Sequence, residues 1–396
     1  MRKNAVNREI RPIEGGVCAV AGFQASAVSC GIRAEGELDL ALIAPEKRCP
    51  VGYVFFGNTA AGSLANVNKK RLKNGYAQAV FISGGRSTVF AENEEKFCEG
   101  VCLEINRSAK YSVDETLYFS VGEFGEKLEF SALRDGIKRI KQGLGNTQEH
   151  SIVATRSLSG GKGIAKQLSF SYDIGDTLCK IGVICKANAN TTFVLMTTDA
   201  AISPKMLQRA LESETRETLQ LLAVANPLTP NDAVCILANG NAGNYKIEYE
   251  DSEYKKFAMA LRATLKEVCK LIALNGKESG CLCCTISGVK SKQSARGLAK
   301  AVAKADCVRL ALLRGEFDVE PLLYTLLAEE SGLKVEDVRV TLTAGTERIT
   351  VFDEGRMLAI DREMVIAYFS SRETGLEIRV GNGNYAATAF GRSIMP

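Results

Sequence analysis

The stretch KIGVICKANANTTFVLMTTD, residues 180–199, changes character halfway along its length. Small and polar residues fill positions 187–190, and positions 191–196 turn abruptly to β-branched and apolar residues. A polar segment followed by such an apolar run is typical of a loop that leads into a buried strand. We place the chemistry of the protein at this junction and interpret the rest of the chain as the frame around it.

Thr191 is the first residue of the apolar run. If the peptide bond before it is cut, its new α-amine, with a pKa of about 7.7 to 8.0, becomes the general base for its own hydroxyl. This chemistry needs no histidine, and the chain has only one, His150, in a polar segment. The alternative interpretation is that Thr191 and Thr192 merely begin a strand. The residues of this stretch leave both interpretations open.

The composition is that of an ordinary globular protein, with 396 residues of which 46% are hydrophobic and 24% charged. A chain of this length can bury a large core and form two or three domains. The net charge of +4 is too balanced for binding nucleic acid or a membrane surface. No run approaches about eighteen apolar residues, and the start has no apolar leader, so we expect a cytoplasmic protein.

The cysteines indicate a reducing compartment, because there are thirteen of them, an odd number, in a chain without a secretory signal. The densest group is Cys281, Cys283 and Cys284, which lacks the paired spacing and the histidines of a zinc site. We therefore expect small buried thiols and no metal centre.

Helices are predicted where apolar residues recur at helical spacing between capping and stop residues, at positions 64–75, 130–144, 204–222, 253–276, 292–305 (capped by Ser291) and 361–369. Short apolar runs predict strands, among them 77–83, 152–155, 231–240, 280–289 and 306–315. The order strand, helix, strand over 281–314 predicts a βαβ unit. The chain thus reads as an α/β protein.

Several segments resemble one family in the same order along nearly the whole chain. They are IEGGVCAVAGFQASAVSCGI, LDLALI, AVFISGG, the TTDAAI after Thr191, NDAVCILANG and SGVKSKQSARGLAKAVAKADCVRLAL. Together they resemble the ornithine acetyltransferase family, arginine-biosynthesis enzymes that are often also N-acetylglutamate synthases. The resemblance implies layered sheets flanked by helices, with a smaller C-terminal α/β domain. We divide the chain into a main domain (1–240), a small helical piece (241–280) and a C-terminal domain (281–396).

The resemblance also implies a mechanism. Family precursors cut themselves before a threonine, which then carries an acetyl group from N-acetylornithine to glutamate. The matching positions are Asn190 and Thr191, so the resemblance favours Thr191 as the nucleophile. Lys180, eleven residues earlier, matches a substrate-binding lysine that would pair with a carboxylate. The implied partners are small amino acids, with acetyl-coenzyme A as another donor, no cofactor, and a dimer of two-chain units.

The chain departs from the family pattern at other implied site positions. Phe90 and Ala91 replace the threonine and glycine of the oxyanion hole, so one hydroxyl donor is missing, with Ser87 and Thr88 as the nearby hydroxyls. Thr155 keeps one substrate-binding hydroxyl, and Glu278 stands for the substrate-binding glutamate. The sequence stops at GRSIMP, where family members continue into a substrate-contacting tail. We therefore expect a divergent, C-terminally shortened member.

Three hypotheses follow. The first is a glutamate N-acetyltransferase that acts through acetyl-Thr191 after self-cleavage. The second is an inactive paralogue that keeps the fold for binding, because the oxyanion pair is replaced. The third is an amidase that uses an N-terminal threonine on another substrate.

Overall fold

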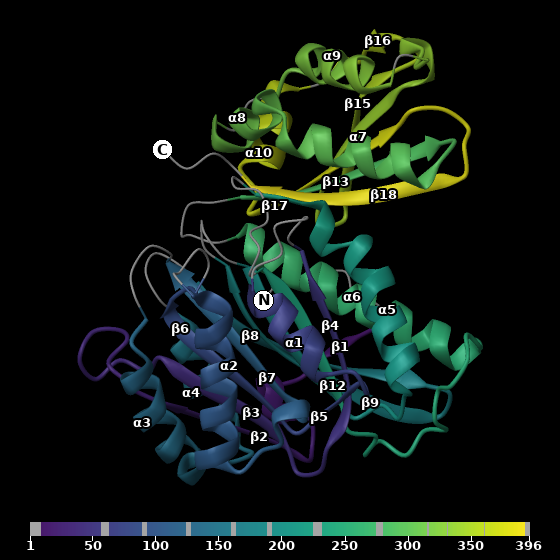
Figure 1. The fold of residues 1–396 in the computed structure, drawn as a ribbon. Helices are drawn as coiled ribbons and strands as arrows, with labels where there is room; N and C mark the ends of the chain where they lie inside the picture. The colour runs from purple at the N-terminus through teal and green to yellow at the C-terminus, as the bar shows by residue number, and fades with distance from the viewer. Residues whose placement is uncertain are drawn as a thin grey trace. The chain divides into compact units, whose positions relative to one another are not determined.

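The computed structural model describes residues 9–56, 63–88, 93–123, 128–159, 164–187, 192–224, 232–274, 280–314, 317–330, 332–359 and 361–392 (Figure 1). Its contacts divide the chain into two compact units. The larger unit comprises the described residues between 7 and 214 and between 228 and 264. The smaller unit comprises those between 215 and 227 and between 265 and 396. The domain boundaries that we predicted at residues 240 and 280 stay predictions.

Two sheets form the frame of the larger unit. The seven-stranded sheet has the order β1-β8-β9-β10-β12-β4-β5, with bounds β1 Arg11–Pro12, β8 Ile164–Ile174, β9 Thr177–Ala187, β10 Thr192–Thr198, β12 Ala233–Ala238, β4 Cys49–Phe55 and β5 Tyr76–Ala77. The four-stranded sheet has the order β2-β3-β6-β7, with bounds β2 Phe23–Val28, β3 Leu40–Pro45, β6 Ala79–Arg86 and β7 Thr116–Glu123. Apolar side chains of both sheets, including Phe119 and Phe193, form one core.

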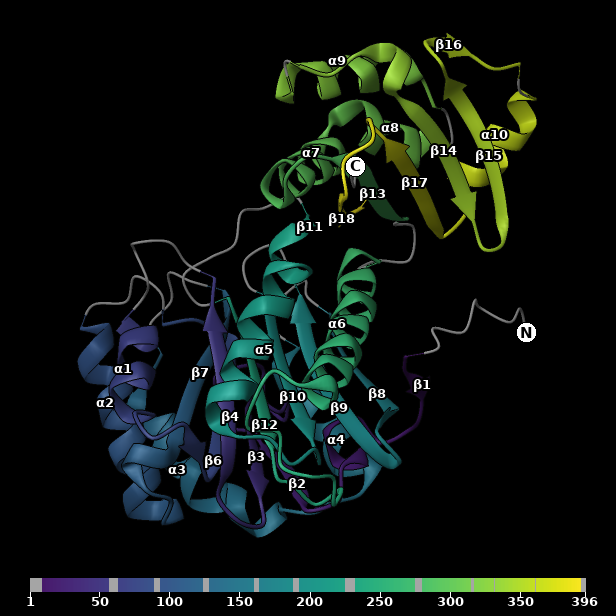
Figure 2. The ribbon, with the colours of Figure 1, turned by 90° about the vertical axis from the view of Figure 1, so that its right-hand side faces the viewer.

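Helices cover these sheets on their other faces. The outer face of the four-stranded sheet packs on α1 (Ser63–Arg71), α2 (Glu94–Glu104) and α3 (Phe130–Ile140), which share a second core with it (Figure 1). The helices α5 (Pro204–Arg216) and α6 (Ser252–Ala273) lie against the seven-stranded sheet (Figure 2). There the Gln208 amide donates to the Tyr53 carbonyl at 2.9 Å. The helix α4 (Gln148–Leu158) places Ala154 and Leu158 in the core shared by the two sheets.

The smaller unit is a sheet with helices packed on a single core. Its strand order is β11-β18-β13-β17-β14-β15-β16, with bounds β11 Leu222–Ala223, β18 Tyr385–Arg392, β13 Cys281–Val289, β17 Glu373–Arg379, β14 Arg339–Ala344, β15 Glu347–Asp353 and β16 Arg356–Met357. Apolar residues of this sheet pack on α7 (Lys292–Lys304), α8 (Asp306–Arg314), α9 (Val319–Glu329) and α10 (Arg362–Phe369) (Figure 2). Short helical turns are η1 Gly16–Ala19, η2 Ile105–Ala109, η3 Val113–Glu115, η4 Lys141–Gly143, η5 Leu219–Leu221 and η6 Val335–Asp337.

The predicted α/β class, with layered sheets and helices, is confirmed. So is the predicted buried strand after position 191, because every residue of β10 is buried. The cap of α7 is also as predicted, since the Ser291 hydroxyl accepts the Ser294 amide at 3.0 Å. Of the helices that the structure describes, none has the length and apolar character needed to cross a membrane.

Two strand predictions were wrong. Residues 306–314 form the helix α8, so the predicted βαβ unit does not exist, and the parallel neighbour of β13 is β17. Residues 152–155 belong to α4 rather than to a strand. A short apolar run has too few residues to separate a strand from a buried helix by its period. In α8 the core contacts come from Val308 and Ala311, at helical spacing.

The strand β9 packs tightly on η1 at Gly182. A Cβ atom built at Gly182 would lie 2.1 Å from the Gly16 carbonyl oxygen and 2.8 Å from Val17 Cα, which are backbone atoms that cannot move alone. We expect Gly182→Ala to lower the free energy of unfolding by about 1–3 kcal/mol. Urea unfolding followed by circular dichroism measures this change, in a Thr191→Ala background that keeps all samples as one chain.

The matched control is Gly100→Ala, in α2 of the same unit. A Cβ atom there meets Phe130 at 3.4 Å, an ordinary van der Waals distance. Alanine in a helix interior is more favourable than glycine by roughly 0.5–1 kcal/mol, so this variant should keep or raise the stability. Equal unfolding midpoints for the two variants would contradict the packing argument.

Candidate functional site

The start of β10 is held from both neighbouring strands. Thr192 pairs with Ala187 of β9, and its backbone N–H donates to the Asp232 carboxylate. Asp232 immediately precedes β12, and its carbonyl accepts the Phe56 N–H at 2.9 Å. Thr192 and Asp232 are 5% and 2% exposed. The backbone that follows Thr191 is therefore fixed in a buried position.

Several predicted site residues lie outside the described residues. They are the cleavage pair Asn190 and Thr191, the oxyanion positions Phe90 and Ala91, and the substrate-binding Glu278. Their roles stay predictions. Thr191 is nevertheless attached directly to Thr192, and consecutive Cα atoms lie about 3.8 Å apart.

A lysine that our sequence analysis did not select, Lys186, lies at this end of the sheet. It is directly opposite Phe193, on the face of β9 that also carries Ile184 into the core. Its side chain is fully buried, and its Nζ has no hydrogen-bond partner among the residues that the structure describes. Burial, the largest cause, and the charge of Arg33 together lower the pKa of Lys186 to about 8, while Glu123 acts in the opposite direction. A buried ammonium of this kind attracts an anionic ligand.

Arg33 adds a second fixed positive charge near Lys186. The Asp39 carboxylate holds the loop of Arg33 by accepting the backbone N–H groups of Cys30, Ile32 and Arg33, at 2.6, 2.7 and 3.2 Å. The Arg33 guanidinium pairs with Glu37 at 2.6 Å and donates to the Leu38 carbonyl. Arg33 therefore contributes its charge to the region, while these contacts occupy part of its hydrogen-bonding capacity.

The residues after β6 are held by the parallel neighbour β7. The Thr88 hydroxyl is hydrogen-bonded to Ser120 at 2.9 Å and to Glu94 at 3.0 Å, and the Ser87 N–H donates to the Glu123 carbonyl at 2.7 Å. Thr88 is buried in these contacts, which favour a structural role over that of a replacement oxyanion donor. Gly84 and Gly85, just before these residues, belong to β6.

Lys180 lies far from the start of β10, and the Thr155 hydroxyl is hydrogen-bonded within its own helix. Lys180 lies beyond the pair Thr198–Ile181, and its backbone N–H donates to Asp199 at 2.7 Å. It precedes Ala187 by seven positions, which is roughly 24 Å in an extended strand. The Thr155 hydroxyl donates to the carbonyl of residue 151 in its own helix at 2.7 Å. Both roles stay predictions, and the strand register favours Lys186 over Lys180 as the lysine nearest to Thr192.

A signal for Lys186 was present in the sequence. In KIGVICKA, side chains of a strand alternate between faces, so Lys186 shares its face with Ile184. A lysine on the apolar face of a buried strand indicates a functional charge, but no strand was predicted over residues 180–187. The family resemblance points to Lys180 instead, eleven residues before Thr191.

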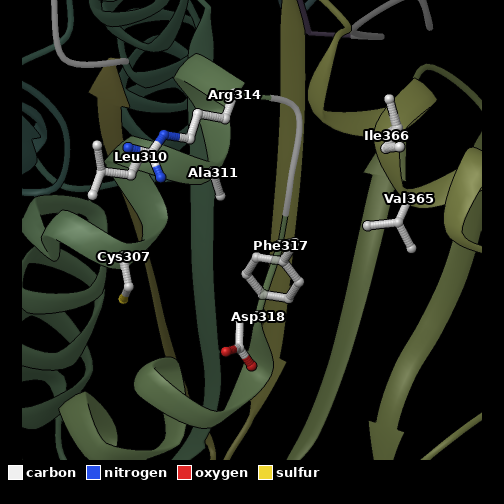
Figure 3. A pocket seen from close by; sticks show the side chains of 8 residues that line it. All are labelled: Cys307, Leu310, Ala311, Arg314, Phe317, Asp318, Val365 and Ile366. Atoms are coloured by element: carbon white, nitrogen blue, oxygen red, sulfur yellow. The ribbon is translucent and has the colours of Figure 1, made fainter.

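We also considered metal-binding groups and the cavity of the smaller unit as candidate sites. Across the described ranges no group of three or more His, Cys, Asp or Glu residues is arranged to hold a metal ion. The smaller unit contains a cavity of about 490 Å³ lined by residues of α8 and α10 together with Phe317 and Asp318 (Figure 3). The Asp318 side chain caps α9 by accepting the Glu320 N–H at 3.0 Å. None of the predicted site residues lines this cavity.

The buried charge of Lys186 should reduce stability. With a pKa of about 8 in the folded protein against 10.5 for a free side chain, the penalty is roughly 3 kcal/mol. Below the pKa of the folded protein, Lys186 is charged in both the folded and the unfolded state, and the full penalty applies. As the pH rises from 8 towards the unfolded pKa, the folded state releases its proton first, and the penalty disappears.

We therefore expect Lys186→Met to be more stable than the parent protein near pH 7 and to lose that advantage near pH 10. Urea unfolding of both proteins at the two pH values tests this expectation, again in the Thr191→Ala background. A stability difference that stays constant with pH would contradict the buried-charge assignment.

Known proteins match this chain over nearly its whole length. A model of the ArgJ family matches residues 24–394. Arginine biosynthesis bifunctional protein ArgJ 1 of Nostoc sp. is 26% identical over 403 residues, covering 96% of this chain and 95% of that protein. The chloroplastic ArgJ of Oryza sativa subsp. indica is 25% identical, covering 96% of this chain and 85% of that protein. The crystal structure of ArgJ from Bacillus halodurans aligns with a TM-score of 0.47 and 22% identity, over 52% of this chain and 95% of that one. Since the family match extends over nearly the whole chain, this protein belongs to the ArgJ family.

Proposed function

We propose that this protein is a glutamate N-acetyltransferase, which moves an acetyl group from N-acetylornithine to glutamate through Thr191 after self-cleavage between Asn190 and Thr191. The family match over residues 24–394 carries this proposal. It is supported by the next residue, Thr192, which begins the buried strand β10 and lies one residue before the pair of Phe193 with the fully buried Lys186.

In the proposed self-cleavage, the Thr191 hydroxyl attacks the carbonyl carbon of Asn190, and the peptide bond becomes an ester. Water hydrolyses this ester, which restores the hydroxyl and frees the α-amine of Thr191. In each turnover the amine accepts the hydroxyl proton while the oxygen attacks the acetyl carbon of N-acetylornithine. Ornithine leaves with a proton. The amine of glutamate then attacks acetyl-Thr191, the ester bond to the Thr191 oxygen breaks, and a proton from the glutamate amine returns to that oxygen as N-acetylglutamate leaves.

Lys186 supplies the positive charge for the substrate in this proposal. Ornithine and glutamate both carry an α-carboxylate, and a carboxylate beside a buried ammonium forms a charge-assisted contact in a site of low dielectric constant. With a pKa of about 8, Lys186 is mostly charged at neutral pH. The substrates are small amino acids, acetyl-coenzyme A is a second donor, no cofactor takes part, and the assembly is a dimer of two-chain units.

A second candidate function is that of an inactive paralogue that binds amino acids without acetyl transfer. The replacement of the family's oxyanion threonine by Phe90 favours it. Loss of one oxyanion donor lowers the rate by roughly 10² to 10³, while the backbone N–H of Ala91 would remain as a donor. The two functions differ in cleavage and in turnover.

Cleavage separates these candidates most simply. We expect the intact masses of the purified protein to show two chains divided after Asn190, and Thr191→Ala to give one chain of 42.7 kDa. The variant should also lower kcat/KM for acetyl transfer by roughly 10⁴-fold or more, as the loss of a nucleophile does. Thr192→Ala is the matched control, because it removes the neighbouring hydroxyl and keeps the backbone N–H. One intact chain in the parent protein would contradict the proposed mechanism.

The two lysines can be compared directly. If Lys186 pairs with the substrate carboxylate, Lys186→Met should lower kcat/KM by roughly 10² to 10³, in line with the 2–5 kcal/mol that removal of one partner of a buried charge pair costs. Steady-state acetyl transfer from N-acetylornithine to glutamate measures it. A larger loss in Lys180→Met than in Lys186→Met would return the assignment to Lys180.

A further inference from the structure

We propose that Asp232 is a positioning residue for the nucleophile, acting through the backbone of Thr192. This inference rests on the proposed function of Thr191 and adds a residue that the sequence analysis did not consider. Its basis is one contact, in which the carboxylate of Asp232 accepts the backbone N–H of Thr192. Both residues are almost completely buried.

The strand ladder explains why this contact is needed. The parallel pairing of β10 with β12 begins at Phe193 and Ala233, so Thr192 lies one residue before the first β12 pair. Its N–H is buried, and a buried donor without an acceptor costs about 1–3 kcal/mol. The Asp232 side chain takes the place of a further strand residue, and it extends the hydrogen bonding of β10 by one position toward Thr191.

The proposed self-cleavage makes the contacts of Thr192 important for holding the new chain end. In the uncut chain, residues 188–191 connect β9 to β10, and the cut would leave Thr191 as a chain end. Chain ends fray unless they are tied to the fold. Thr192 would then carry the first contacts that hold the new terminus, namely its pairing with Ala187 and its N–H bond to Asp232.

The reacting groups need a fixed distance, because a misplacement of about 1 Å can lower a rate by roughly 10²-fold. Asp232 does not touch the reacting atoms in this proposal. Its carboxylate fixes the backbone that carries the hydroxyl and the amine. The expected signature is therefore a fall in kcat with little change in KM, since the substrate carboxylate is bound elsewhere, by Lys186.

The same strand offers a matched control. At the far end of β10 the Asp199 carboxylate, which is also buried, accepts the backbone N–H of Lys180 at 2.7 Å. Asp199→Ala removes the same kind of contact from the same strand without touching Thr192. It therefore reports how much a lost carboxylate cap affects the sheet in general.

The experiment compares the parent protein with Asp232→Ala, Asp232→Asn and Asp199→Ala. We expect Asp232→Ala to lower kcat for acetyl transfer by about 10²-fold with KM changed less than about 3-fold. Asparagine keeps an oxygen acceptor, so Asp232→Asn should recover at least about ten-fold of that loss. Asp199→Ala should leave kcat within about two-fold of the parent. Equal losses in Asp232→Ala and Asp199→Ala, or no recovery in Asp232→Asn, would overturn the inference.

Amide hydrogen exchange, measured by mass spectrometry, gives a readout independent of activity. The peptide that contains Thr192 should exchange faster in Asp232→Ala than in the parent, while Asp199→Ala should leave it unchanged. Unchanged exchange in Asp232→Ala would overturn the inference even if kcat fell. A parent protein with neither cleavage nor acetyl transfer would overturn the proposed function instead, and the exchange data would still decide whether Asp232 holds Thr192.

Discussion

The register between β9 and β10 is the constraint on which the candidate site depends. Side chains alternate between the two faces of a strand, so a slip by one residue would move Lys186 from the core to the opposite face. In the observed register Lys186 lies opposite Phe193 and enters the core between the sheets. The same register pairs Thr192 with Ala187, at the end of both strands. A single pairing thus determines which charge lies nearest to the start of β10.

That placement opposes stability, and in the proposed mechanism it favours substrate binding. An ammonium taken out of water is unfavourable unless it is paired, and no partner for Lys186 is found within the described part of the chain. Arg33 adds to the positive charge, and Glu123 offsets part of it. A substrate carboxylate would relieve the penalty, so ligand binding and folding are linked. The apolar core around Phe119 and Phe193, whose ring centroids lie 4.8 Å apart, supplies the stability that this arrangement requires.

Local signals in the sequence predicted the elements that have strong periodicity or caps. The helix α6, the buried strand β10 and the cap of α7 at Ser291 follow from such signals. The short segments 152–155 and 306–314 were misassigned, because their helical form depends on cores that distant strands provide. Most of the thirteen cysteines are buried, as the prediction of small buried thiols required, and burial raises the pKa of the Cys49 thiol to about 12.

The site itself was harder to predict than the fold, because its groups come from distant segments. Asp232 follows Thr192 by forty residues, and Arg33 precedes Lys186 by more than one hundred and fifty. Only the folded sheets bring these groups to one end of β10. An unfolded chain therefore lacks the contacts that hold Thr192, next to the proposed cleavage site. In the proposed mechanism, cleavage must then follow folding. In the same mechanism, the buried position of β10 between β9 and β12 would keep the new terminus in place, because its departure would break the pairing with both strands.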